Sequence, residues 1–228
     1  VHIGSIRDTH IGNPHHSTGG KTPVIVVAFR GTSSGTDLLV DSMAKTTKFE
    51  RSLSQVHTGF YATMKSIELQ VLNAILAAGA ELTKLTTKRP LLLVTGHSLG
   101  GAMSQLFSQT SSMLKILREG VGMTKPPIVV HNYTFGSPRV GDRHWHDLVG
   151  TDSYAQVHNF LDIKDPVPRL PPLHTPFSYE RSGLNYMVEQ SKGIVSVYRG
   201  EIFNDPMEFS IWRLPIRLFS AVKHMDSH

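Results

Sequence analysis

Residues 91–102 read LLLVTGHSLGGA, and the expected architecture of the chain can be worked out from them. An apolar run of strand length ends in the pattern Gly-x-Ser-x-Gly, and small and apolar residues compatible with a helix continue from there to Leu117. A strand, a sharp turn at a serine and a helix make up a nucleophile elbow, which exposes the serine hydroxyl above the sheet edge. Gly96 and Gly100 are needed in such a turn because side chains there would collide.

The pentapeptide by itself is a weak signal. With glycine and serine each near 7% of residues, Gly-x-Ser-x-Gly arises by accident in roughly one chain in ten to fifteen of this length. The strand before it and the helix after it make an accident several-fold rarer. We therefore interpret Ser98 as a candidate nucleophile and the amide of Leu99, at the helix start, as a donor for an oxyanion.

Composition predicts a single globular domain over residues 1–228. The chain is long enough for a substantial core, and 39% hydrophobic with 18% charged residues is typical of soluble proteins. No apolar run approaches the ~18 residues that a membrane span requires. The net charge is +5, but Lys and Arg are scattered without a basic tract, which argues against nucleic acid as a partner.

The chain contains no cysteine, so disulfides, thiolate metal sites and cysteine nucleophiles are excluded. This slightly favours an intracellular or organellar compartment over secretion. His15 and His16 lack partners at ligand spacing, so we expect a solvated loop there and no metal or cofactor in the protein. Because the sequence starts at Val1 without an initiator Met or an apolar leader, we expect that a native N-terminal segment is missing.

Strand and helix patterns alternate along the chain. Beyond the strand before Ser98, we expect strands at residues 1–7, 24–29, 127–135 and 154–161, and an antiparallel hairpin at residues 185–199. Apolar residues at steps of three and four predict a long helix over residues 59–85, and a short helix ends near Leu148. This alternation predicts an α/β fold with a mostly parallel central sheet and helices on both faces.

The loop after residues 24–29 leaves the end of a strand where α/β hydrolases place their second oxyanion donor. Thr32 is the candidate donor through its amide, and the alternative is an ordinary turn that caps a helix. Residues 37–43 follow as a short amphipathic segment that could serve as a lid. His57 comes before Ser98 in the chain, so we interpret it as a hydrogen-bonded structural residue.

A nucleophilic serine needs an imidazole to take its proton and an acid to hold that imidazole. In this fold the order along the chain is serine, acid, histidine. Asp162 and Asp165 follow the strand at residues 154–161, and Pro166 and Pro168 would stiffen the loop that carries them.

Three histidines follow the acid: His174, His224 and His228. His174 lies on the acid's own loop and is disfavoured as the base. His228 follows Asp226-Ser227, a pattern typical of a helix start, but it is the last residue and could lack support. We favour His228 as the triad base and keep His224 as the alternative.

Five blocks of this sequence together resemble the class 3 lipase family, to which the filamentous-fungal triacylglycerol lipases belong. The blocks run in the family's order: VVAFRGT (26–32), VHTGFY (56–61), TGHSLGGA (95–102), FGSPRVGD (135–142) and DPVPRLPP (165–172). The resemblance implies an α/β-hydrolase fold, with Ser98 as nucleophile and Asp165, rather than Asp162, as the acid. It also implies an oxyanion hole made by Thr32 and Leu99.

The resemblance further implies that residues 33–43 form a lid over an acyl-binding groove. The lid residues are Ser33, Leu38, Leu39, Val40 and Met43. The expected activity is hydrolysis of carboxylic esters of lipids, of the triacylglycerol lipase type, through an acyl-enzyme and at a lipid-water interface. Alternatives are a phospholipase, a short-chain carboxylesterase, or a catalytically silent relative that binds acyl ligands.

Overall fold

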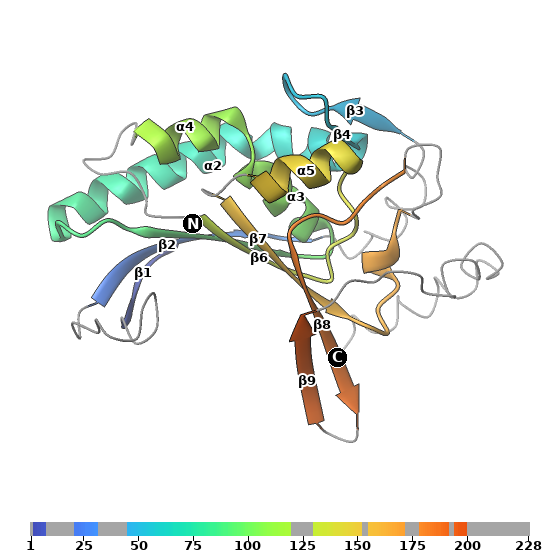
Figure 1. The fold of residues 1–228 in the computed structure, drawn as a ribbon. Coiled ribbons are helices and arrows are strands. Elements are labelled where there is room, and N and C mark those ends of the chain that lie inside the picture. Colours follow the sequence, from blue (N-terminus) through green and yellow to red (C-terminus); the bar gives the residue numbers. More distant parts are fainter. Residues whose placement is uncertain are drawn as a thin grey trace.

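The structure, a computed structural model, describes residues 2–7, 21–31, 45–119, 130–151, 155–171, 178–191 and 194–199. In this part of the chain a seven-stranded sheet has the strand order β1-β2-β5-β6-β7-β8-β9 (Figure 1). The strands are β1 (His2–Arg7), β2 (Lys21–Phe29), β5 (Leu91–His97), β6 (Val130–Phe135), β7 (Ala155–Asp162), β8 (Leu184–Ser191) and β9 (Ile194–Arg199). The five inner strands of this sheet, β2, β5, β6, β7 and β8, run parallel. Strands β1 and β9 pair antiparallel at the two edges. The predicted edge strand, mostly parallel sheet and C-terminal hairpin are confirmed.

Four α-helices and one 3-10 turn are described. They are α2 (Thr58–Leu85), α3 (Leu99–Ser108), α4 (Ser111–Glu119), α5 (Arg143–Thr151) and η1 (Val167–Arg169), and a two-stranded sheet of β3 (Thr46–Lys48) and β4 (Gln55–His57) precedes α2. The long predicted helix is confirmed as α2. The prediction of one unbroken helix from the elbow to Leu117 is wrong, because a new helix starts after Thr110. Side chains replace the helical acceptors there: Thr110 Oγ1 accepts from the Met113 N–H at 3.2 Å, and Glu50 accepts from the Ser111 N–H at 2.9 Å.

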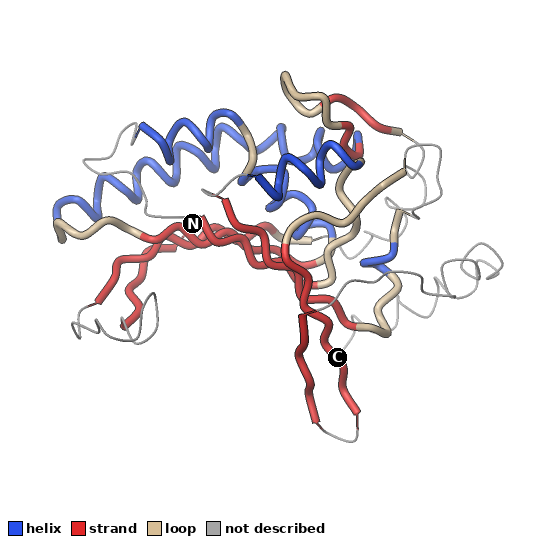
Figure 2. Tube along the Cα trace, in the orientation of Figure 1, coloured by secondary structure: helices blue, strands red, loops and turns tan. Residues whose placement is uncertain are grey.

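The described helices α2, α3, α4 and α5 all lie over the same face of the sheet (Figure 1, Figure 2). Within these residues, the prediction of helices on both faces is therefore met on one face only. The reason is the strand order, because each parallel strand from β2 to β7 is added on the same side of the one before it. Right-handed crossovers that advance in one direction place every connecting helix on the same face.

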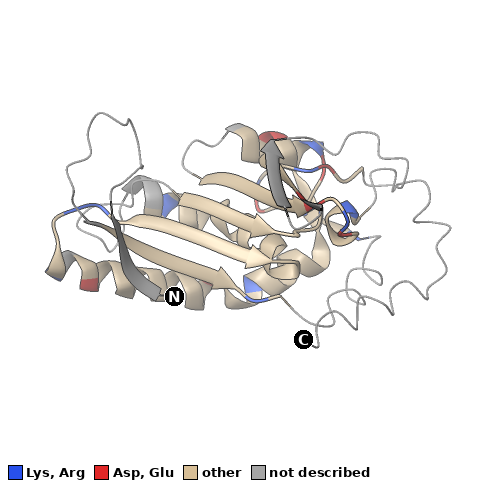
Figure 3. Ribbon diagram, turned by 90° about the horizontal axis from the view of Figure 1, so that it is seen from below, with Lys and Arg blue, Asp and Glu red and all other residues tan. Residues whose placement is uncertain are grey.

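In the part of the chain that the structure describes, the central strands of the sheet face turned away from these helices carry no charged residue. Figure 3 views this face directly, and β5 and β6 contain no Lys, Arg, Asp or Glu. A row of rings crosses this face from β6 over β7 to β8, with neighbouring centroids 4.9–6.3 Å apart. Its members are His131, Tyr133, Phe135, His158, Phe160 and Tyr186. Stacked aromatic pairs across strands stabilise a sheet beyond its hydrogen bonds.

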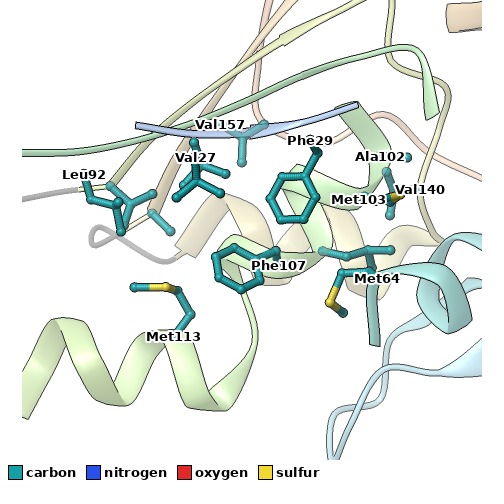
Figure 4. Close-up of a cluster of buried hydrophobic side chains, with 14 of the residues drawn as sticks. Val27, Phe29, Met64, Leu92, Ala102, Met103, Phe107, Met113, Val140 and Val157 are labelled. Carbon is teal, nitrogen blue, oxygen red and sulfur yellow. The ribbon is translucent and has the colours of Figure 1, made fainter. Parts of the chain in front are cut away.

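The core lies between the sheet and the helices (Figure 4). Phe29 of β2 packs against Phe107 of α3 with their ring centroids 5.3 Å apart, and Met64 of α2 lies in the same cluster. All ten residues of α3 are buried. Because full burial of large apolar side chains contributes about 1.5–3 kcal/mol each, α3 is held firmly against the sheet, and so is the turn before it.

Candidate active site

Ser98 lies on the turn between β5 and α3, in a conformation that L-residues rarely adopt. Its backbone angles are φ 53° and ψ −125°. Such a conformation costs about 1–3 kcal/mol and persists only where the surrounding structure enforces it. Here β5 lies between two parallel strands, α3 is buried, and the Ser98 N–H donates to the Phe135 carbonyl at 3.0 Å. The predicted sharp turn at this serine is thus present.

The two glycines of the elbow occupy positions where a side chain would collide with the backbone, as the sequence predicts. A Cβ on Gly96 would lie 2.2 Å from the Gly100 carbonyl oxygen, and a Cβ on Gly100 would lie 2.2 Å from the Phe29 carbonyl oxygen. Carbon atoms do not approach backbone oxygens this closely. The end of β2 and the start of α3 can therefore approach each other this closely only because position 100 has no side chain.

The loop that follows β2 lies directly against the elbow. A Cβ on Gly31 would be 2.7 Å from the His97 carbonyl oxygen and 3.7 Å from Ser98 Cβ. Gly31 is the last described residue of that segment, so Thr32 and the lid residues 33–43 lie outside the described residues. On the other side of the elbow, Leu99 is the first residue of α3, and the first amides of a helix have no acceptor within the helix.

Asp162, the last residue of β7, and Asp165, in the loop that follows, perform different tasks. The exposed Asp162 accepts from the Lys164 N–H at 2.8 Å through Oδ1, and its carbonyl accepts from the Asp165 N–H at 3.1 Å. These bonds make Asp162 a turn-forming residue. Asp165 is half-buried, and its Oδ1 accepts from the Val167 N–H at 2.9 Å.

Burial raises the pKa of the Asp165 carboxyl, and the Val167 amide together with the neighbouring His97 and Arg169 acts in the opposite direction. The net direction is upward. A carboxylate withdrawn from water in this way gains from a cationic partner, which is what an imidazolium in a catalytic triad supplies.

The loop after β7 that carries Asp165 is called the acid loop here. It meets the elbow at Gly136, which follows β6 with φ +57°. A Cβ on Gly136 would lie 2.8 Å from Asp165 Oδ2 and 3.6 Å from His97 Nε2. The candidate acid and the residue before the candidate nucleophile thus flank one point, although they come from strands on either side of β6. The position of His97 beside the acid was not expected from the sequence, which gives no sign of contacts between distant residues.

The candidate bases His224 and His228, and the disfavoured His174, lie outside the described residues. His57 has the structural role that was predicted for it. Its ring is fully buried, its Nδ1 accepts from the Phe60 N–H at 3.3 Å, and the ring stacks on Phe60 at 3.8 Å. It thereby caps the start of α2.

Neither a metal-binding cluster nor a membrane-spanning helix occurs among the described residues. No cluster of three or more His, Cys, Asp or Glu side chains there is arranged to bind a metal ion. Nor does any described helix combine the length and apolar character needed to cross a membrane.

The family model described as lipase (class 3) matches residues 26–175, which include the elbow, the loop after β2 and the acid loop. The chain belongs to this family. The resemblance seen in the five sequence blocks is therefore confirmed. The α/β-hydrolase fold is confirmed as well, because this class 3 lipase chain superposes on the crystal structure of a lipase from Rhizopus microsporus var. chinensis. The TM-score is 0.62 at 26% identity, over 82% of this chain and 61% of that one.

The chain is also similar to fungal lipases. It is 31% identical to secreted mono- and diacylglycerol lipase 1 of Fusarium solani over 134 residues, which are 59% of this chain and 34% of that protein. It is 27% identical to a lipase of Rhizomucor miehei over 173 residues, which are 75% of this chain and 43% of that protein. The chain thus spans less than half the length of either relative.

Proposed function

We propose that this class 3 lipase chain is a serine hydrolase that cleaves carboxylic esters of lipids, in the manner of a triacylglycerol lipase. The single observation that carries the proposal is the strained turn at Ser98, enclosed by β2, β5 and α3, with the carboxylate of Asp165 across β6. A serine in this conformation costs the protein free energy. A role as the nucleophile of acyl transfer explains why the strained conformation is kept. The names of both fungal relatives agree with this substrate class.

The proposed reaction is that of a serine–histidine–aspartate triad. His228, or His224 in its place, takes the proton of Ser98 Oγ as this oxygen attacks the ester carbonyl. The amides of Thr32 and Leu99 stabilise the oxyanion that forms, and the imidazolium gives its proton to the departing alcohol. Water then attacks the acyl-enzyme with the same imidazole as base, which releases the fatty acid and restores Ser98.

Asp165 is the better candidate for the triad acid. The carboxylate of Asp162 is exposed and already occupied as a turn cap, whereas Asp165 directs Oδ2 toward the side of the elbow. One oxygen of Asp165 is bound by the Val167 amide, which fixes the carboxylate's orientation. An acid that holds an imidazole in one tautomer requires such a fixed orientation.

A serine-directed phosphonate tests the proposal. We expect one phosphonate per chain on Ser98, no labelling of Ser98→Ala, and full labelling of the matched control Ser66→Ala, which removes an exposed hydroxyl on α2. Of His224→Ala and His228→Ala, the variant that lacks the base should lose labelling. An unmodified wild-type protein would instead support the catalytically silent, acyl-binding alternative.

The same preparation separates the enzyme classes. Nitrophenyl esters of increasing chain length, assayed below and above their solubility limits, report on the lid at residues 33–43. A rate that rises across the limit supports a lipase acting at a lipid-water interface, and flat rates support a short-chain carboxylesterase. Fatty acid release from phosphatidylcholine in preference to triacylglycerol would support a phospholipase.

A further inference from the structure

Arg139 binds the end of the acid loop through its backbone and its side chain. It lies in the loop after β6 and is 2% exposed. Its N–H donates to the Leu170 carbonyl at 2.7 Å, and its Nη1 donates to the Arg169 carbonyl at 2.5 Å and the Pro171 carbonyl at 2.8 Å. One residue therefore binds three consecutive carbonyls.

The acid loop is also closed from within. The Arg169 side chain donates through Nη2 to the Ile163 carbonyl at 2.7 Å, and the short turn η1 joins the two ends. Asp165 lies between these anchors. The segment that presents the carboxylate is thus held at its start by Arg169 and at its end by Arg139.

The segment that carries Arg139 is fixed to the elbow. At its start, the Phe135 carbonyl accepts from the Ser98 N–H, and Gly136 lies between Asp165 and His97. One residue beyond Arg139, the Val140 carbonyl accepts from the His57 N–H at 2.9 Å. Arg139 consequently joins the backbone that supports Ser98 to the backbone that carries Asp165.

A buried guanidinium is costly unless its donors are satisfied, and its planar fork suits several acceptors at once. The acceptors of Nη1 are the carbonyls of Arg169, the last residue of η1, and of Pro171 beyond it. We propose that Arg139 is a positioning residue, which keeps Asp165 where it can orient the triad histidine. This inference rests on the proposed function, because it takes Asp165 as the triad acid.

The test compares Arg139→Met, Arg139→Lys, Asp165→Asn and the double variant Arg139→Met/Asp165→Asn, with rates expressed per site titrated by phosphonate. We expect Arg139→Met to lower kcat about 10- to 100-fold with KM nearly unchanged, because small displacements of catalytic groups have effects of this order. Arg139→Lys should recover part of the loss. In Arg139→Met, the acid limb of the pH profile of kcat/KM should move to lower pH, because an imidazole that loses its carboxylate partner has a lower pKa.

A merely structural role would reduce the number of titrated sites and the melting temperature, but it would leave kcat per site and the acid limb unchanged. That result would overturn the proposal. In the Asp165→Asn background, Arg139→Met should lower kcat by less than about threefold, because the carboxylate that Arg139 positions is no longer present. Losses that multiply in the double variant would also overturn it.

The variants distinguish this inference from the proposed function. If Asp165→Asn keeps wild-type activity, the acid assignment itself fails. If Asp165→Asn is inactive while Arg139→Met behaves as wild type, only the positioning role fails. Arg143→Met, which removes an exposed arginine of α5, is the matched control and should behave as wild type. Should Arg139→Met not fold, Arg139→Lys carries the test: a several-fold loss in kcat with the same pH shift supports the proposal, and wild-type values overturn it.

Discussion

At the scale of single residues, the elbow shows how backbone sterics select an amino acid. Glycine stands at position 100 because the β2 carbonyl of Phe29 occupies the place of a Cβ. The consequence for Ser98 is a rigid turn on which this half-buried serine has a positive φ. The absence of a side chain at position 100 thus permits the turn that carries Ser98.

Gly100→Ala should therefore be severely damaging. Its Cβ would lie 2.2 Å from a backbone oxygen, so β2 and α3 must separate, and overpacking costs at least about 1–3 kcal/mol. We expect a lower melting temperature and a loss of phosphonate labelling at Ser98. The matched control is Gly150→Ala on α5, where a Cβ would meet nothing within 4 Å and should stabilise by about 0.5–1 kcal/mol with labelling unchanged. Equal behaviour of the two variants would contradict the steric account.

At the scale of elements, α3 is joined to the sheet by buried polar side chains as well as by apolar packing. Gln105 donates through Nε2 to Ser137 Oγ at 2.9 Å and to Asn159 Oδ1 at 3.1 Å, and its Oε1 accepts from Ser182 Oγ at 3.2 Å. These partners belong to the loop after β6, to β7 and to the segment before β8. One side chain thus sets the position of α3 relative to β7 and to two segments that adjoin the sheet.

Gln105→Leu should lower the free energy of unfolding by about 1–3 kcal/mol, because it removes the acceptor of the buried Ser182 hydroxyl and a donor to Ser137 and Asn159. Urea denaturation measures the change. Gln70→Leu, at an exposed position of α2, is the control and should stay within about 0.5 kcal/mol of wild type. A tolerated Gln105→Leu would mean that apolar packing alone positions α3.

At the scale of the whole molecule, the monotonic strand order puts the described helices on one face and the aromatic row on the other. His131 and His158 belong to this row. Burial lowers the pKa of both rings, and His131 further lowers that of His158. The stability of the sheet is therefore coupled to pH on the face opposite the helices.

We expect the melting temperature to fall as the pH drops below about 6.5, the ordinary histidine pKa, because the unfolded chain then binds protons that the folded chain does not. Above that pH both states carry neutral rings, and the effect vanishes. His131→Phe and His158→Phe keep a stacked ring but cannot bind a proton, so each should weaken the pH dependence between pH 7 and 5. His144→Phe, at an exposed position of α5, is the control. A pH dependence that is identical in all three variants would exclude the row as its source.

Several features could be predicted from the sequence because neighbouring residues encode them. The long helix α2 follows from apolar spacing, the central strands β2 and β5 from continuous apolar runs, and the elbow from two glycines around Ser98. Periodicity and backbone sterics act over a few residues, so the chain alone determines them. The family blocks added the order of the candidate site residues.

Other features depended on contacts between distant parts of the chain, and only the tertiary structure decided them. At the break after α3, the Ser111 N–H donates to Glu50, from the turn between β3 and β4. The placement of the helices on one face follows from the strand order, and Arg139 binds the acid loop because β6 and β7 are neighbours in the sheet. Residue spacing along the chain carries no measure of such distances, because they are set by how the strands pair in space.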